Sequence, residues 1–235
     1  MKNRIVVVVT FLLFMFAIAL AEEPLLPKES QKVFAENGSI FYSLDGKNKI
    51  RLTKGPKDST PAISPDGKKV VFLRKSEKEA YLAVGSPEDY LQSGPDGILA
   101  DQVWIVDIDG KNEKILVRDR NPDEKGYKEW KGEDVIAHID DPSLQFSTDG
   151  KKIYFISSAW VTSGALHSVN IDGTKEHFIA PANYLKVIPD GEYKGNLLIQ
   201  QHRYFLKGGS YDWYYVFTPE GKEVGPLAES LEDID

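Results

Sequence analysis

The chain has 235 residues, enough for one large domain or two small ones, and its lack of cysteine excludes disulfides, thiolate metal sites and a cysteine nucleophile. Hydrophobic residues make up 41% of the chain and aromatic residues 11%, so it can bury a core and is not globally disordered. Lys and Arg number 29 against 36 Asp and Glu, spread along the chain without a basic patch. We therefore expect no nucleic-acid partner, because such a surface repels phosphate backbones.

The first 21 residues are typical of a secretory signal peptide. Lys2 and Arg4 form a positive start, residues 5–20 are apolar except for Thr10, and residues 19–21 read Ala-Leu-Ala, as at a cleavage site. Sixteen helical residues span roughly 24 Å, short of the ~30 Å hydrocarbon core. We expect a periplasmic or secreted domain, residues 22–235, with 27 basic and 36 acidic residues, a net charge of −9 and no stable membrane span. The alternative is an uncleaved leader that anchors the chain.

Two segments of the mature chain share one pattern without a gap. Residues 58–72 read DSTPAISPDGKKVVF, and residues 141–155 read DPSLQFSTDGKKIYF. A weaker third copy covers 185–200. Among the positions of the pattern that hold the same residue in both strong copies are Asp58, Ser64, Asp66, Gly67 and Phe72 in the first, and Asp141, Ser147, Asp149, Gly150 and Phe155 in the second.

The turns and their flanks predict short antiparallel strands. Asp-Gly is typical of two-residue hairpin turns, and the flanking residues are β-branched or aromatic and partly alternate. Related turns end at Gly110, Gly173 and Gly221. A repeat of about forty residues with four strands per unit predicts an all-β fold, a β-propeller of about four four-stranded antiparallel blades.

The Ser-Pro-Asp-Gly-Lys-Lys-Val-Val-Phe block at 64–72, followed by a Val-Asp-Ile-Asp-Gly turn at 106–110, resembles the WD-like repeat of TolB-type β-propellers. The resemblance covers roughly residues 33–228. It implies the propeller fold, and the motif itself identifies a fold element that carries no chemistry.

Blades are predicted with strands A to D running from the channel to the rim. Blade 1 has B, C and D at 32–35, 39–44 and 49–53; blade 2 has A to D at 61–64, 69–74, 102–107 and 113–118; blade 3 at 144–147, 152–157, 166–171 and 176–180; blade 4 at 184–188, 197–205, 212–217 and 222–227. The missing strand A of blade 1 would come from the C-terminal tail or from 25–30. An alternative makes 88–117 a separate, fifth blade with its turn at 93–97.

Function is expected on the face that carries the long connections. B–C and D–A connections emerge together, and the two longest, 76–101 and 119–137, belong to these classes. We expect this face to bind a protein partner or a glycan, through aromatic side chains of the kind common in binding hot spots. The candidates are Tyr81, Tyr90, Tyr127, Trp130, Trp160 and Tyr211. The alternative for each is that it packs its own loop onto the blades.

Catalytic alternatives rest on weaker patterns. His138, Gln200 and His202 would hold a metal if the blades brought them together, and oligogalacturonate lyases are similar in combining a TolB-like propeller with a His/Gln-bound metal. That alternative is a metal-dependent lyase or hydrolase on carbohydrate. The chain contains no G-x-S-x-G motif, so we expect no serine-hydrolase chemistry. The main prediction is a binding or scaffold module without a cofactor; self-association into a larger ring is a third possibility.

Asp58 and Asp141 precede strand A in the two strong repeats. Asp at such a position usually accepts a hydrogen bond from nearby backbone N–H groups and orders its loop. The alternative is that both carboxylates face the channel and bind a cation.

Overall fold

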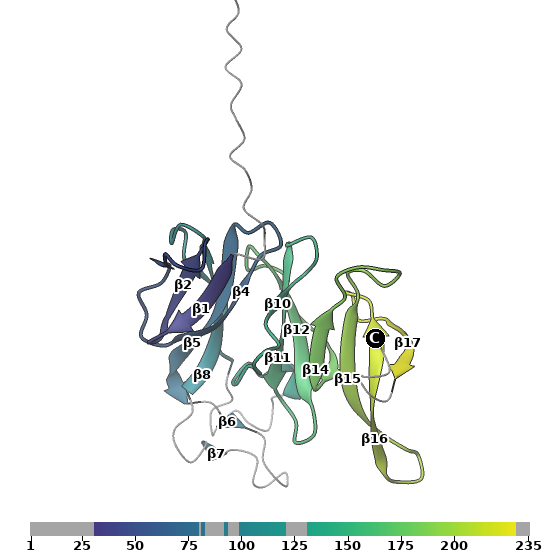
Figure 1. The fold of residues 1–235 in the computed structure, drawn as a ribbon. Helices are drawn as coiled ribbons and strands as arrows, with labels where there is room; N and C mark the ends of the chain where they lie inside the picture. The colour runs from purple at the N-terminus through teal and green to yellow at the C-terminus, as the bar shows by residue number, and fades with distance from the viewer. Residues whose placement is uncertain (1–30, 80, 83–91, 94–98, 121–130, 229–235) are drawn as a thin grey trace, which may run out of the picture.

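The computed structural model describes residues 31–79, 81–82, 92–93, 99–120 and 131–228, and regular structure there is almost entirely antiparallel β-sheet. Four sheets stand side by side (Figure 1). Blade 1 contains β1 (Lys32–Glu36), β2 (Ser39–Ser43) and β3 (Ile50–Arg51). Blade 2 contains β4 (Asp58–Ile63), β5 (Lys69–Glu79), β8 (Leu99–Asp107) and β9 (Lys114–Val117). Blade 3 contains β10 (Gln145–Phe146), β11 (Lys152–Ser158), β12 (Gly164–Asn170) and β13 (His177–Ala182). Blade 4 contains β14 (Tyr184–Val187), β15 (Leu197–Tyr204), β16 (Ser210–Phe217) and β17 (Glu223–Ala228).

Strands follow one another in each sheet in chain order, which confirms a propeller of about four blades. The five-blade alternative is wrong, because β5 pairs directly with β8 from Lys69 opposite Asp107 to Glu79 opposite Leu99. The insertion between them contributes the small hairpin β6 (Tyr81–Leu82) and β7 (Gln92–Ser93), and most of the proposed 93–97 turn lies outside the described residues.

The A–B turns at Asp66-Gly67 and Asp149-Gly150 are longer than the two residues expected, whereas the β1–β2 turn at Asn37-Gly38 has two. Ser64 N–H bonds to the carbonyl of Lys69, so the A–B loop of blade 2 has four residues, and Ser147 and Lys152 repeat this in blade 3. Gly67 and Gly150 adopt left-handed φ values of 72° and 71°, which glycine takes without a steric penalty. The Asp-Gly signal was therefore right about the place of the turn and wrong about its type.

Apolar layers between neighbouring blades form the core. Phe72 lies in the layer between blades 1 and 2, and Phe155 lies in the layer between blades 2 and 3. Both side chains are fully buried, and each faces the preceding blade, which confirms their equivalence. Successive strand residues point to opposite faces. Val71 therefore joins the layer on the other side of β5 from Phe72.

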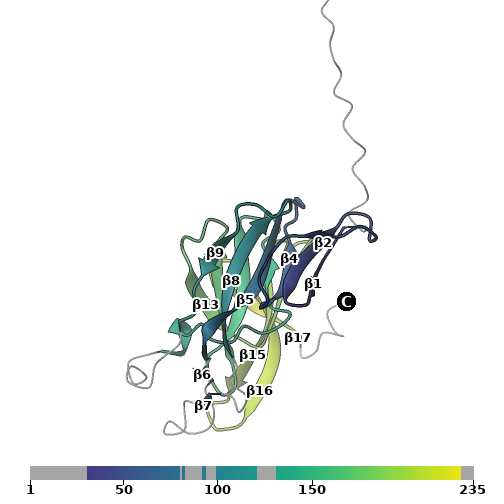
Figure 2. The ribbon, with the colours of Figure 1, turned by 90° about the vertical axis from the view of Figure 1, so that its left-hand side faces the viewer.

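Blade 1 packs on blade 2 through β1, β2 and β4, as Figure 2 shows from the blade 1 side. Within the described residues, no strand pairing joins blade 1 to blade 4, and the described part has no strand A for blade 1. The two segments predicted to supply that strand, 25–30 and the C-terminal tail, lie outside the described residues.

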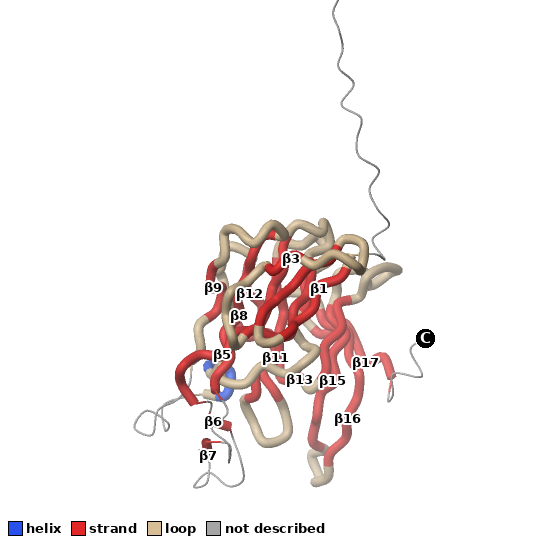
Figure 3. Tube along the Cα trace, turned by 60° about the vertical axis from the view of Figure 1, so that its left-hand side comes forward, coloured by secondary structure: helices blue, strands red, loops and turns tan. Residues whose placement is uncertain are grey.

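The two ends of the blades differ in the length of their connections. Tight A–B turns lie at the upper end in Figure 1, while β6, β7 and the β11–β12 and β15–β16 connections lie at the lower end. The described ends of the two long connections are joined there, because Asp101 N–H donates to the carbonyl of Ala137 at 2.7 Å. One turn of 3-10 helix, η3 (Gly132–Asp134), is the helical segment of the described part and is blue in Figure 3.

Candidate functional site

The innermost strands β4, β10 and β14 present unpaired edges to the centre of the molecule. Each stands at the end of its sheet and pairs on one side only, with β5, β11 and β15 respectively. A strand edge carries backbone N–H and C=O groups that can pair with a further strand. The fold thus places edges from three blades around one central space.

A cavity of about 720 Å³ occupies this space at the A–B turn end. Its lining combines apolar side chains with hydroxyl, amide and charged groups. The lining residues are Gln31, Ala62, Ile63, Ser64, Pro65, Asp66, Gly67, Leu144, Gln145, Phe146, Ser147, Thr148, Val187, Pro189 and Lys194. A concave site that brings apolar side chains and polar groups together is a candidate binding site.

The repeat motif fixes the mouth of the cavity. Ser64 Oγ donates to the carboxylate of Asp66 at 2.6 Å and accepts from the N–H groups of Lys68 and Lys69. The hydroxyl of Ser64 is the main reason that the pKa of Asp66 is below its usual value. Ser147 and Asp149 repeat every one of these contacts in blade 3, and the pKa of Asp149 is lowered for the same reason. The motif residues therefore act as rigid turn elements.

Gln145 joins two of the inner strands. Its side-chain amide donates to the carbonyl of Leu185 at 2.7 Å, and its amide oxygen accepts from Val187 N–H at 2.9 Å. The side chain therefore occupies backbone groups on the β14 edge that a neighbouring strand would otherwise satisfy. Sequence reasoning missed Gln145. Its one signal was an amide residue in strand A, where the first repeat has Ala62.

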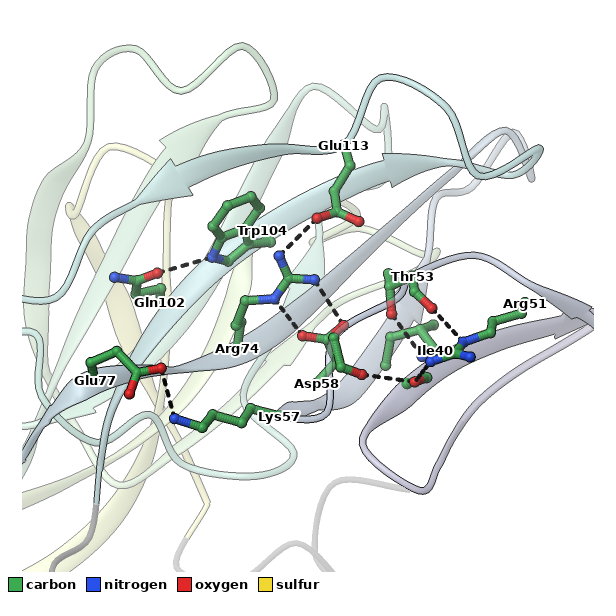
Figure 4. A network of polar contacts seen from close by, with 12 residues as sticks. Ile40, Arg51, Thr53, Lys57, Asp58, Arg74, Glu77, Gln102, Trp104 and Glu113 are labelled. Carbon is green, nitrogen blue, oxygen red and sulfur yellow. Dashed lines mark hydrogen bonds and ion pairs between the residues drawn. The ribbon is translucent and has the colours of Figure 1, made fainter.

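Asp58 and Asp141 are not equivalent in the fold. The side chain of Asp58 is fully buried and accepts two hydrogen bonds from Arg74, at 2.5 and 2.8 Å (Figure 4). Asp141 is exposed, in a turn where Ser143 N–H bonds to the carbonyl of Asp140. The expected backbone-capping role is wrong for the side chain of Asp58, which pairs with a guanidinium. Neither aspartate lines the central cavity.

Two of the six predicted aromatic candidates can be placed with their side chains. The indole of Trp160 is about one-third exposed and packs over Gly132, where an added Cβ would lie 2.2 Å from the ring. It also makes an edge contact with Phe178. Tyr211 packs on Phe205, with ring centroids 4.6 Å apart. Tyr81 belongs to β6 without a described side chain, and Tyr90, Tyr127 and Trp130 lie outside the described residues.

The three candidate metal ligands are not brought together. His138 Nδ1 lies 3.2 Å from Asp101, between blades 2 and 3, whereas His202 Nδ1 lies 2.9 Å from Asp212 in blade 4. Gln200 alternates in β15 with residues of the layer against blade 3, so it and His202 point away from that blade. Among the residues whose placement is described, no group of three or more His, Asp and Glu has a metal-binding arrangement.

Asp101, the partner of His138, has a structural role instead. Burial raises the pKa of its carboxyl, but hydrogen bonds from His138 and Ile139 N–H and the ammonium of Lys75 outweigh burial and lower it. The carboxylate thus ties the B–C insertion of blade 2 to the segment that enters blade 3.

Comparison with known proteins supports the fold alone. No family model and no curated protein matches the chain. Dipeptidyl peptidase 4 from Porphyromonas gingivalis is similar over 86% of this chain and 31% of its own, with 11% identity and a TM-score of 0.53. The β-propeller domain of the Trilobed protease from Pyrococcus furiosus is similar over 85% of this chain and 53% of its own, with 15% identity and a TM-score of 0.47. TolB from Acinetobacter baumannii is similar over 85% and 52%, with 12% identity and a TM-score of 0.38.

The chain spans about a third to a half of the length of these three structures. The observed sheets define the molecule as an all-β propeller module of about four blades. No helix in the described ranges is long and apolar enough to cross a membrane.

Proposed function

We propose that this protein is an exported, non-catalytic binding module that holds an extended peptide segment of a protein partner in its central cavity. The observation that carries the proposal is the meeting of inner strand edges around a cavity of about 720 Å³. An extended peptide can pair its backbone with such an edge while its side chains enter apolar pockets. Export is supported by the three-part leader over residues 1–21.

The chemistry of the lining favours a peptide of mixed character over a highly charged ligand. Leu144, Phe146 and Val187 offer apolar surface, and the hydroxyls of Ser64 and Ser147 are already engaged in their own turns. Asp66 and Lys194 are the charged lining residues, and both are exposed at the rim. Charged groups of both signs at the mouth and apolar groups inside suit a peptide whose central side chains are apolar.

The position of Gln145 indicates which of the inner strand edges is free to pair with a peptide. Because its side chain satisfies backbone groups of Leu185 and Val187, part of the β14 edge is already occupied. The edges of β4 and β10 carry no equivalent side-chain bridge among the described residues. A bound peptide is therefore expected to pair with the edge of β4 or of β10. The aromatic long-loop face remains a second predicted contact region, whose main residues lie outside the described part.

Site-specific photo-crosslinking tests the proposal in the cell that produces the protein. A photoreactive amino acid at Lys194, on the rim of the cavity, is expected to capture one defined partner. The matched control is the same amino acid at Glu220, which is exposed in the C–D turn of blade 4 and does not line the cavity. The same adducts from both positions, or adducts from neither, would contradict binding in the cavity. N-terminal sequencing of the exported protein should begin at Glu22, and a retained Met1 would contradict cleavage.

A further inference from the structure

The β15–β16 hairpin lies at the long-loop end and reaches beyond the β11–β12 connection, as Figures 1 and 3 both show. Its two strands remain paired up to Tyr204 opposite Ser210. A compact turn closes the hairpin, with Phe205 N–H bonded to Gly209 and Gly208 N–H bonded to Phe205. The tip is therefore a defined projection held by backbone hydrogen bonds.

Apolar side chains cover this tip and face solvent. Tyr204 is 66% exposed, Phe205 58% and Leu206 fully exposed. The neighbouring β11–β12 connection adds Val161, which is 58% exposed, and Thr162 Oγ1 lies 3.3 Å from the hydroxyl of Tyr204. Exposed apolar side chains from connections of two blades thus gather at this end, and we call Tyr204, Phe205, Leu206 and Val161 the hairpin tip. A contiguous exposed apolar patch usually marks an interaction site.

Charge is distributed unevenly around the hairpin tip. The chain holds 36 Asp and Glu, yet none lies between Glu192 and Asp212 or between Asp149 and Asp172. At the tip itself Lys207 is exposed, while Arg203 is neutralised by Glu223 at 2.6 Å. Asp212 is the nearest acid in the hairpin and pairs with His202. The hairpin tip itself therefore combines apolar side chains with one exposed basic residue.

We propose that the hairpin tip inserts into the headgroup region of a lipid bilayer. Aromatic and aliphatic side chains beside a lysine are the combination that anchors proteins at membrane interfaces. The full exposure of Leu206 at the end of the hairpin favours this occupant over a protein groove, because a bilayer can surround such a side chain on all sides. Within the hairpin, no acidic residue lies beside Lys207 to oppose its attraction to an anionic surface.

This inference is independent of peptide binding, because the tip and the central cavity lie at opposite ends of the blades. Docking by the hairpin tip would leave the mouth of the cavity directed away from the bilayer. Failure of one proposal therefore leaves the other unaffected.

Fluorescence at single introduced cysteines tests the proposal, since the natural chain has none. The mature protein carries an environment-sensitive dye at Ser210→Cys, beside the tip, or at Lys151→Cys, in an exposed A–B turn at the opposite end. On adding vesicles of phosphatidylethanolamine and phosphatidylglycerol, we expect a blue shift at position 210 and none at 151. No shift at 210, or equal shifts at both positions, would overturn the proposal.

A pair of variants distinguishes binding through the hairpin tip from non-specific binding through other exposed apolar residues. Phe205→Ser with Leu206→Ser should weaken vesicle partitioning on the order of tenfold or more, because two large apolar side chains no longer leave water. Ile50→Ser, at a site 53% exposed on blade 1, should leave partitioning unchanged. Thermal melts check that both variants are folded. Equal loss in both variants, or loss in neither, would overturn the proposal, as would a tip that binds a purified protein partner but no vesicle.

Discussion

The guanidinium of Arg74 donates two hydrogen bonds to the fully buried carboxylate of Asp58, joining the first two strands of blade 2. A third donor of Arg74 reaches Glu113 at 2.7 Å, and its guanidinium lies 4.4 Å from the ring centre of Trp104. The carboxylate of Asp58 is the main cause that raises the pKa of Arg74. One side chain therefore ties strands A, B and C of the blade to the start of strand D (Figure 4).

Replacing Arg74 by Met should destabilise the protein by about 3–5 kcal/mol, because it leaves the buried charge of Asp58 without a partner. Chemical denaturation measures the change. Combining Arg74→Met with Asp58→Leu should recover much of the loss, since the charge is then gone. The control is Lys111→Met, which breaks a solvent-exposed pair with Asp109 and should leave stability nearly unchanged. Equal effects of Arg74→Met and Lys111→Met would contradict a buried pair.

Phe72→Ala and Phe155→Ala should each cost about 3–5 kcal/mol, because each removes a large ring from a layer between blades. Both side chains are fully buried, with 0% of their surface accessible to water. Denaturant melts of the two variants should shift alike. A loss below about 1 kcal/mol in either one would show that its ring is not in the core, since surface changes typically stay within about 0.5 kcal/mol.

Gly38 and Gly46 form a matched pair for backbone packing. Both have left-handed φ, 70° and 73°, but an added Cβ at Gly38 would lie 2.0 Å from the carbonyl oxygen of Pro56, while Gly46 has nothing within 4 Å. Gly46→Ala should cost about 1–2 kcal/mol from backbone strain. Gly38→Ala should cost clearly more, because the chain from blade 1 to blade 2 must also move. Equal losses of stability in the two variants, measured by melting, would mean that the close approach of Gly38 to Pro56 does not contribute to stability.

Glu176 should make stability depend on acid pH. Burial raises the pKa of its carboxyl, but hydrogen bonds from His167, at 2.7 Å, and from Arg120 outweigh burial and lower it to about 2 from an ordinary 4.5. A depressed pKa in the folded state stabilises the protein above the unfolded pKa, and this contribution is lost as pH falls through about 2. For this largely buried group it amounts to roughly 3 kcal/mol.

Urea melts of the wild type and Glu176→Gln test this assignment. Glu176→Gln should be less stable near neutral pH, and the difference should shrink as pH falls from about 4.5 toward 2. Other acids with lowered pKa, such as Asp66 and Asp149, titrate in both proteins and cancel in the comparison. A difference that is constant with pH would contradict the role of the Glu176 charge.

Sequence patterns predicted the blades because the information is local. Ser64 and Ser147 each bond within their own turn, so the motif around them has the same meaning wherever it occurs. The turn length was misjudged because the hydroxyl of Ser accepts from two following N–H groups, which favours a four-residue loop over the two-residue turn that Asp-Gly alone suggests.

The candidate site was harder to predict because it depends on contacts between blades. Gln145 acts on β14, forty residues away in the chain, and no pattern within its own repeat indicates that contact. Asp58 and Asp141 align in sequence, yet their partners differ. The residue that pairs with Asp58 is Arg74, whereas Ser157 takes the corresponding place in β11, where its hydroxyl accepts from Ala137 N–H. Alignment of the two repeats therefore predicts that their backbones are equivalent, but it does not predict the partners of the aligned side chains.

Binding in the central cavity is tested most directly by titrating a synthetic peptide, matching the segment crosslinked at Lys194, into the mature protein and its variants. Thr148→Trp places a large ring at the cavity lining without touching the buried layers, and Glu220→Trp is the control outside the cavity. We predict that Thr148→Trp weakens the affinity by about tenfold or more, a loss of about 1.4 kcal/mol, while Glu220→Trp binds like the wild type. An unchanged affinity in a folded Thr148→Trp variant would contradict binding in the cavity.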